Sequence, residues 1–205
     1  MSRLISILFI VVVTIQAEQL IALQLPNNLQ FEMTESEALS VMEAATDSAI
    51  TIVDRDTYQI LTVKFMQVYG KNRVNQLRAF VSAQKGLFSV EEETFLKWDH
   101  QQPESENLEV HRRVLESVLT HLRQQYGDED LLEETPVGER HGRFQHVTAT
   151  WQFPDERWIH LIYEPQDWSL YPELVKVVVI YRSSVLDPRM SQADGSPNSF
   201  RNSKR

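Results

Sequence analysis

The stretch Leu174-Val175-Lys176-Val177-Val178-Val179-Ile180-Tyr181 decides the fold class of this chain. It is apolar at every position except Lys176, so it lacks the alternation of apolar and polar residues that marks a half-exposed strand. Such a run is typical of a strand that is buried on both faces in the middle of a sheet. We therefore predict a central strand over 174–182.

Two further strands, over 143–153 and 157–163, precede this one, and the tight turn Pro154-Asp155-Glu156 joins them into a hairpin. We expect Phe153 to lie opposite Trp158. One face of the hairpin then carries Ala149, Trp151, Phe153, Trp158, His160 and Ile162. A three-residue turn would shift the register by one position and reverse the faces.

The clearest helix pattern of the chain begins after the polar linker 101–106 and ends at Gly127. Its apolar stripe at 3.6-residue spacing consists of Leu108, His111, Leu115, Val118, Leu119, Leu122 and Tyr126. We interpret His111 as an amphipathic residue at the margin of the core. Its alternative role is a general base, for which the sequence does not single out a carboxylate.

A second helix is predicted over 35–46, because Thr34 and Glu37 have the spacing of a capping box. The rest of this part of the chain predicts strands over 29–33, 49–53, 58–69, 74–83 and 87–95. The stretch 58–69 has a helical alternative that ends at Gly70. Its content of Thr, Ile, Val, Tyr and Phe favours the strand.

These elements predict an α+β fold with helices packed on an antiparallel β-sheet, arranged as two successive helix-plus-meander halves in one compact domain. We expect this single domain over 18–182, with possible sub-lobes 26–98 and 107–182. Residues 183–205 are rich in Ser, Asn, Pro and Gly, which predicts a disordered polar tail.

Composition excludes several classes of protein. The 205 residues are 42% hydrophobic and 24% charged, which is typical of a globular chain and not of a collagen-like, coiled-coil or disordered one. The absence of cysteine excludes a disulfide scaffold, a thiolate metal site and a thiol nucleophile. A net charge of −9 argues against a nucleic-acid partner.

Residues 1–17 have the pattern of a secretory signal peptide. Arg3 supplies a positive start, 4–15 is an apolar run without charge, and Ala17 precedes the polar Glu18. This run is shorter than the roughly 20 apolar residues that span a membrane. We expect cleavage after Ala17, no transmembrane segment after that cleavage, and export to the periplasm or the exterior. An uncleaved anchor is the alternative.

Motifs of catalysis are absent from the sequence. It has no Gly-rich phosphate loop, nucleophile elbow, His-Glu-x-x-His motif or dinucleotide fingerprint. His141, His146 and His160 suggest a metal site, but the expected hairpin register points His146 and His160 to opposite faces. We therefore expect no catalytic residue, no metal and no cofactor.

Two acidic runs have structural interpretations. Residues 128–134 lack the glycine and the oxygen spacing of a calcium loop, so we expect a solvated linker. Three successive carboxylates at Glu91-Glu92-Glu93 predict an edge strand whose charges discourage the addition of another strand.

Aromatic residues form the candidate binding site. Trp151 and Trp158 lie on the hairpin, and Trp168 and Tyr171 lie in the loop that follows it. A core layer beneath the long helix is the structural interpretation of this cluster. The functional interpretation is a partly exposed groove that binds a peptide or a glycan through flat rings.

The sequence favours an exported, non-enzymatic binding or accessory module of the cell envelope, with a protein or envelope component as partner. An inhibitor or immunity-type protein with an acidic binding surface is one alternative. A small exported hydrolase that uses His and carboxylate is the other. The sequence leaves the oligomeric state open.

Overall fold

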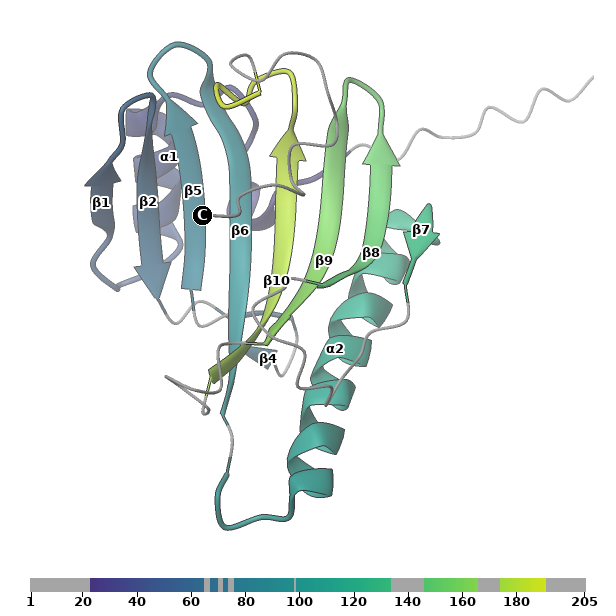
Figure 1. Ribbon diagram of the computed structural model, residues 1–205. Helices are drawn as coiled ribbons and strands as arrows, with labels where there is room; N and C mark the ends of the chain where they lie inside the picture. The colour runs from purple at the N-terminus through teal and green to yellow at the C-terminus, as the bar shows by residue number, and fades with distance from the viewer. Residues whose placement is uncertain are drawn as a thin grey trace, which may run out of the picture.

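The computed structural model describes residues 23–64, 67–69, 72–73, 76–97, 99–133, 146–165 and 174–190 (Figure 1). The predicted signal peptide and residues 191–205 of the predicted tail lie outside these ranges. Within them, two α-helices and one eight-stranded antiparallel sheet form a single α+β domain, which confirms the predicted fold class.

The strand order of the large sheet is β1-β2-β5-β6-β10-β9-β8-β7. The strands are β1 (Thr51–Asp54), β2 (Tyr58–Lys64), β5 (Gln76–Ser82), β6 (Gly86–Lys97), β10 (Leu174–Ser183), β9 (Arg157–Pro165), β8 (His146–Phe153) and β7 (Leu131–Leu132). A separate hairpin pairs β3 (Gln67–Tyr69) with β4 (Asn72–Arg73). The described part of 58–69 is therefore strand, as predicted.

Strand β10 lies in the middle of the sheet, between β6 and β9. Val177, Val178 and Val179 are all buried, so side chains on both faces of β10 are removed from water. The apolar pattern of 174–181 thus correctly predicts a central strand.

Both helices lie on the same face of the sheet (Figure 1). Helix α1 (Glu35–Ala44) begins with the predicted capping box: the Glu37 N–H donates to Thr34 Oγ1, and the Thr34 N–H donates to Glu37 Oε2 at 2.8 Å. Helix α2 (Glu104–Tyr126) buries a stripe that consists of Asn107, His111, Leu115, Val118, Leu122 and Tyr126. Among the described helices, none is long and apolar enough to cross a membrane.

The N-terminal part of the described chain packs into the same core. Leu25 and Leu29 flank the 3₁₀ turn η1 (Pro26–Asn28) and are buried with both helices. The predicted strand over 29–33 does not form. Glu32 adopts a φ of 72°, and the segment makes two backbone hydrogen bonds with Leu87 before it enters α1.

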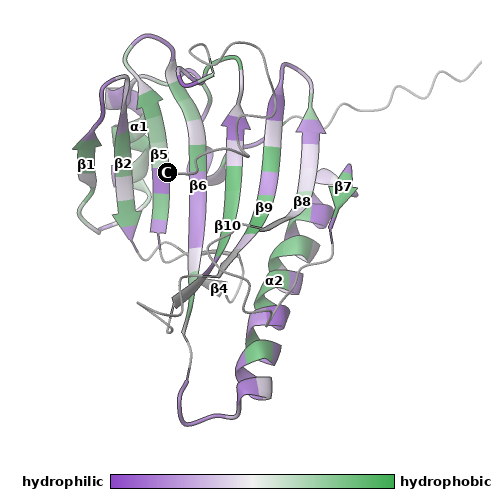
Figure 2. Cartoon of the chain, in the orientation of Figure 1, coloured by the Kyte–Doolittle hydropathy of each residue, from purple (hydrophilic) through white to green (hydrophobic). Residues whose placement is uncertain are grey.

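The expectation that 91–93 marks a sheet edge is wrong. Strand β6 pairs with β5 on one side and with β10 on the other, and Figure 2 shows its hydrophilic stretch beside the hydrophobic β10. Glu91 and Glu93 point to the face opposite the helices, and Glu92 points to the helix face. There Glu92 is 1% exposed and accepts a hydrogen bond from the Tyr181 hydroxyl at 3.1 Å.

The β8–β9 hairpin has the alternative register. Phe153 lies opposite Arg157, because the turn has three residues, and Trp158 lies opposite Gln152. Trp151 and Phe153 therefore face the helices, whereas Trp158 and His160 face the other side. The expectation that Trp151, Phe153 and Trp158 share one face is wrong.

The acidic run 128–134 is not only a linker. Its centre forms the edge strand β7, where Leu131 pairs with Thr150 and Leu132 pairs with Ala149 of β8. The carboxylate of Glu129 accepts hydrogen bonds from the Arg123 guanidinium near the end of α2. The run thus joins the sheet through backbone pairing, which the charge pattern does not reveal.

Gly86 permits the close approach of the N-terminal segment, and its replacement by alanine tests this packing. Its φ is +73°, and an added Cβ would lie 2.2 Å from the carbonyl oxygen of Glu32. Gly86→Ala is expected to lower the free energy of unfolding by at least about 2 kcal/mol. Gly127→Ala is the matched control, because Gly127 has a φ of +84° with nothing within 4 Å.

Urea denaturation of both variants measures this difference. The control has a strained backbone but no clash, so we expect a smaller loss than in Gly86→Ala. If both variants lose the same free energy of unfolding, the close contact with the Glu32 carbonyl oxygen does not restrict the side chain at position 86.

Candidate functional site

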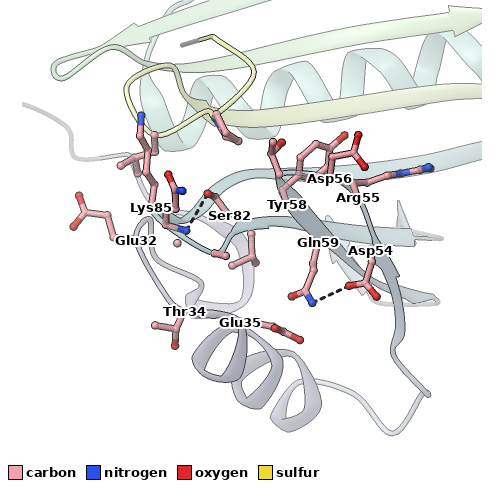
Figure 3. A pocket seen from close by; sticks show the side chains of 17 residues that line it. Glu32, Thr34, Glu35, Asp54, Arg55, Asp56, Tyr58, Gln59, Ser82 and Lys85 are labelled. Carbon is pink, nitrogen blue, oxygen red and sulfur yellow. Dashed lines mark hydrogen bonds between the residues drawn. The ribbon is translucent and has the colours of Figure 1, made fainter. Parts of the chain in front are cut away.

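A groove with a volume of about 1040 Å³ lies at one end of the sheet. The β1–β2 turn, the β5–β6 turn, the segment before α1 and the segment after β10 form its walls. Figure 3 shows Glu32 and Lys85 on one side of this groove and Asp54, Arg55 and Asp56 on the other. Four segments that are distant in the sequence therefore converge here.

Hydrogen bonds hold the walls of the groove in place. The Gln59 side-chain amide donates to Asp54 Oδ1 at 2.9 Å, next to the β1–β2 turn (Figure 3). The Gln84 N–H donates to the buried Ser82 Oγ at 3.3 Å in the β5–β6 turn. The Lys85 ammonium donates to the carbonyl oxygen of Val185 at 2.9 Å and links this turn to the segment after β10.

The groove is acidic. Its lining includes four carboxylates, from Glu32, Glu35, Asp54 and Asp56, and two basic side chains, from Arg55 and Lys85. In the described parts of the chain, none of the four carboxylates takes part in an ion pair. The groove thus has negative charge available for a cationic group.

One wall of the groove is the strap, by which we mean residues 184–190. We predicted disorder from 183 onwards, but this segment packs on the sheet. Asp187 is 1% exposed and pairs with Arg182 of β10 and with Arg189 of the strap. Burial raises the pKa of the Asp187 carboxyl, but hydrogen bonds from Arg189 and the charges of both guanidinium groups outweigh burial, so the pKa lies below its ordinary value.

Three aromatic rings surround the guanidinium of Arg189. Its Cζ lies 5.5 Å from the ring centroid of Tyr58, 5.7 Å from that of Phe80 and 5.2 Å from that of Phe88. The Tyr58 and Phe88 rings meet at 89°, and Phe80 is tilted against both. We call these three residues the aromatic cage. It lies on the face opposite the helices, and Tyr58 also lines the groove.

A network of charges crosses the same face beside the cage. Arg78 of β5 pairs with Glu91 and Glu93 of β6, and Glu93 also pairs with Lys176 of β10. Burial raises the pKa of Glu91, and the Arg78 charge opposes this shift. Arg78 and Lys176 thus compensate the charges of Glu91 and Glu93 on the central strand β6. We assign this network a structural role.

The residues predicted as a binding site are not brought together where the structure describes them. Trp151 is 2% exposed in the core, and its indole N–H donates to the carbonyl oxygen of Gly127 at 3.0 Å. Trp158 is half-buried on the opposite face, with its ring stacked on His160. Trp168 and Tyr171 lie outside the described residues.

The histidines occupy separate positions. His111 is buried at the interface of α2 and β9, where its Nδ1 is 3.5 Å from the Tyr163 hydroxyl. His160 Nδ1 is 3.1 Å from Thr150 Oγ1. His141 and the side chain of His146 lie outside the description. In the part of the chain that the structure describes, no cluster of three His, Cys, Asp or Glu residues is placed to hold a metal ion.

No local sequence pattern indicates the groove or the aromatic cage. Tyr58, Phe80 and Phe88 belong to three strands, and their alternation along each strand predicts only that they share a face with neighbours two positions away. Arg189 belongs to the segment for which the composition predicts disorder. The clustering of two arginines around Asp187 is a local signal that could have extended the folded part beyond 183.

Comparisons of the chain with protein-family models, with curated proteins and with solved structures find no match.

The environment of His160 predicts a pH dependence of stability. Burial, together with the positive charge of Arg182, lowers the pKa of His160 from 6.5 to about 4. Between these values the unfolded chain binds a proton that the folded chain does not. The stabilisation is complete above pH 6.5 and is lost as the pH falls towards 4, by up to about 3 kcal/mol.

Urea denaturation at several pH values tests this shift. His160→Gln is expected to flatten the fall in stability between pH 6.5 and pH 4.5, relative to the unsubstituted chain. His100→Gln is the control, because His100 is an exposed histidine. If both variants keep the full slope, His160 does not cause it.

Proposed function

We propose that this protein is an exported, non-enzymatic binding module of the cell envelope, and that its groove takes a basic segment of a partner protein. The observation that carries this proposal is the excess of carboxylates around the groove. Groups such as Glu32 and Asp56 are exposed and take part in no described ion pair, so a cationic partner gains their attraction without breaking a bond in this chain.

The dimensions and lining of the groove support a peptide rather than an apolar small molecule. Its volume of about 1040 Å³ lies just above the usual range for small-molecule pockets. Such pockets are lined mostly by apolar side chains, whereas charged and polar residues predominate around this groove. An extended basic segment uses both the carboxylates and the aromatic edge that Tyr58 supplies.

The same acidic groove favours a second function, that of an inhibitor or immunity-type protein. In that role the basic segment belongs to an enzyme or toxin, and binding blocks its activity. The two functions share the groove and differ in what binding does to the partner. An activity assay on the captured partner separates them.

We infer export from residues 1–17, whose positive start and short apolar run favour a cleaved signal peptide. A periplasmic or extracellular location follows from that proposal. The expected partner is then a protein or another component of the envelope.

We also propose that the domain is built from two successive helix-plus-meander halves. In support, α1 is followed by the strands that take the order β1-β2-β5-β6, and α2 is followed by those that take the order β10-β9-β8-β7. Both helices pack on one face, and β6 and β10 meet at the centre.

Binding of a fluorescent hexa-arginine peptide tests the groove. Glu32→Gln/Asp56→Asn removes two groove carboxylates and is expected to weaken binding about fivefold at low salt, because each exposed charge contributes up to about 1 kcal/mol. Fluorescence anisotropy measures the affinity, at about 20 mM and about 150 mM salt, where screening weakens the effect.

Glu43→Gln/Asp47→Asn is the matched control. It removes one Glu and one Asp that are also exposed but lie outside the groove. Equal weakening in both double variants would mean that net charge, and not the groove, attracts the peptide. A hexa-glutamate peptide that binds as tightly as hexa-arginine would also contradict the proposal.

A further inference from the structure

We propose that the aromatic cage formed by Tyr58, Phe80 and Phe88 is a binding site for a guanidinium or alkylammonium group, and that Arg189 of the strap occupies it in place of a partner's side chain. The cation of an intermolecular ligand and Arg189 would then compete for one site. This inference deepens the proposed function and rests on it for the origin of the ligand. The cation specificity of the cage is independent of that function.

The composition of the cage matches the chemistry of cation recognition. Aromatic faces attract a cation within about 6 Å of the ring centroid, and several rings around one site select alkylated ammonium groups. All three rings lie within that distance of the Arg189 Cζ. The buried Asp187 carboxylate adds a hydrogen-bond acceptor, which receives the Arg189 Nε–H at 2.9 Å.

The cage is largely assembled without Arg189. Phe80 and Phe88 are 4% and 0% exposed, and they pack with Ile60 and with the partly buried Tyr58 and Leu186. The guanidinium of Arg78 lies 5.2 Å from the Phe80 centroid and supports that ring. Asp187 keeps its ion pair with Arg182 when Arg189 leaves. The three rings of the site therefore belong to strands of the sheet and not to the residue that fills it.

Arg189 is an exchangeable occupant. Its side chain is 40% exposed, and its hydrogen bonds run to Asp187, only two residues earlier in the same strap. The strap is tied to the rest of the domain by the Ser184 N–H bond to Glu156 and by the Lys85 bond to Val185. Its Asp187 adds a backbone hydrogen bond to Ser183 and the buried ion pair with Arg182. Arg189 lies beyond these anchors in the sequence, so its side chain leaves at a lower free energy than a residue of a strand that is paired on both sides.

The cage and the groove are continuous. Tyr58 belongs to both, and Leu186 and Pro188 of the strap line the groove. A basic segment that enters the groove brings its side chains next to Arg189, and an arginine or lysine of the partner takes the cage once the Arg189 side chain leaves it. The strap thereby limits binding to partners that supply this cation.

Chemical rescue with methylguanidinium tests the cage alone. Arg189→Ala empties the site, and we expect methylguanidinium to bind this variant with half-saturation at about 1 mM. The unsubstituted chain is expected to bind at least ten times more weakly, because its own guanidinium competes. Nuclear magnetic resonance of the aromatic ring protons measures both titrations. N-methylurea, a neutral analogue of similar shape, is expected not to bind either protein.

A second variant identifies the site. Arg189→Ala/Tyr58→Leu keeps an apolar side chain at the partly buried position 58 and removes one ring, so methylguanidinium binding is expected to weaken at least fivefold. If Arg189→Ala does not fold, Arg189→Gln replaces it, because glutamine retains much of the side chain without the charge. Equal binding of methylguanidinium and N-methylurea, or equal binding with and without the Tyr58 ring, would overturn the proposal.

The hexa-arginine peptide separates the cage from the groove. Arg189→Ala is expected to bind it more tightly than the unsubstituted chain, and Arg189→Lys is expected to leave the affinity unchanged. If methylguanidinium binds Arg189→Ala but the groove variants do not alter peptide binding, the cage stands and the proposed function fails. If the groove variants weaken peptide binding but methylguanidinium does not bind, the groove stands and the cage is refuted.

Discussion

The pairing of β6 with β10 is the interaction on which the rest of the domain depends. Nine residue pairs, from Leu174 opposite Lys97 to Arg182 opposite Ser89, join the strands that precede α2 to those that follow it. Without this ladder the two sets of strands would lack their shared core beneath α1 and α2. The apolar β10 buries both of its faces at this joint, and β6 must accommodate three carboxylates there.

The three carboxylates of β6 need partners within the sheet, and this need determines where the charges of the sheet lie. Glu92 faces the helices and accepts a hydrogen bond from Tyr181, whereas Glu91 and Glu93 meet the cations of the opposite face. Removing one partner of such a buried pair costs more than the pair contributes, because a charge is left without compensation. The face opposite the helices therefore carries a fixed polar centre. The strap, the aromatic cage and the groove lie towards one end of it.

The sequence predicted the elements better than their arrangement. The stripe of α2, the capping box of α1 and the buried β10 are local patterns, and the structure confirms all three. The position of β6 depends on a pairing with a strand about 85 residues away, which charge alone cannot reveal. The hairpin register depended on a one-residue difference in turn length, and it moved Trp158 to the other face. The groove and the cage combine side chains from several strands and from the strap, so no local sequence motif predicts them.

Native-state hydrogen exchange of the Glu91, Glu92 and Glu93 amides tests most directly that β6 is a central strand. In this arrangement β6 is paired with β5 on one side and with β10 on the other, so these amides exchange only through global unfolding. They are predicted to exchange as slowly as those of Val177 and Val179 in β10. If they exchange as fast as the amides of the edge strand Thr51–Asp54, the acidic run lies at a sheet edge and the β6–β10 joint does not exist.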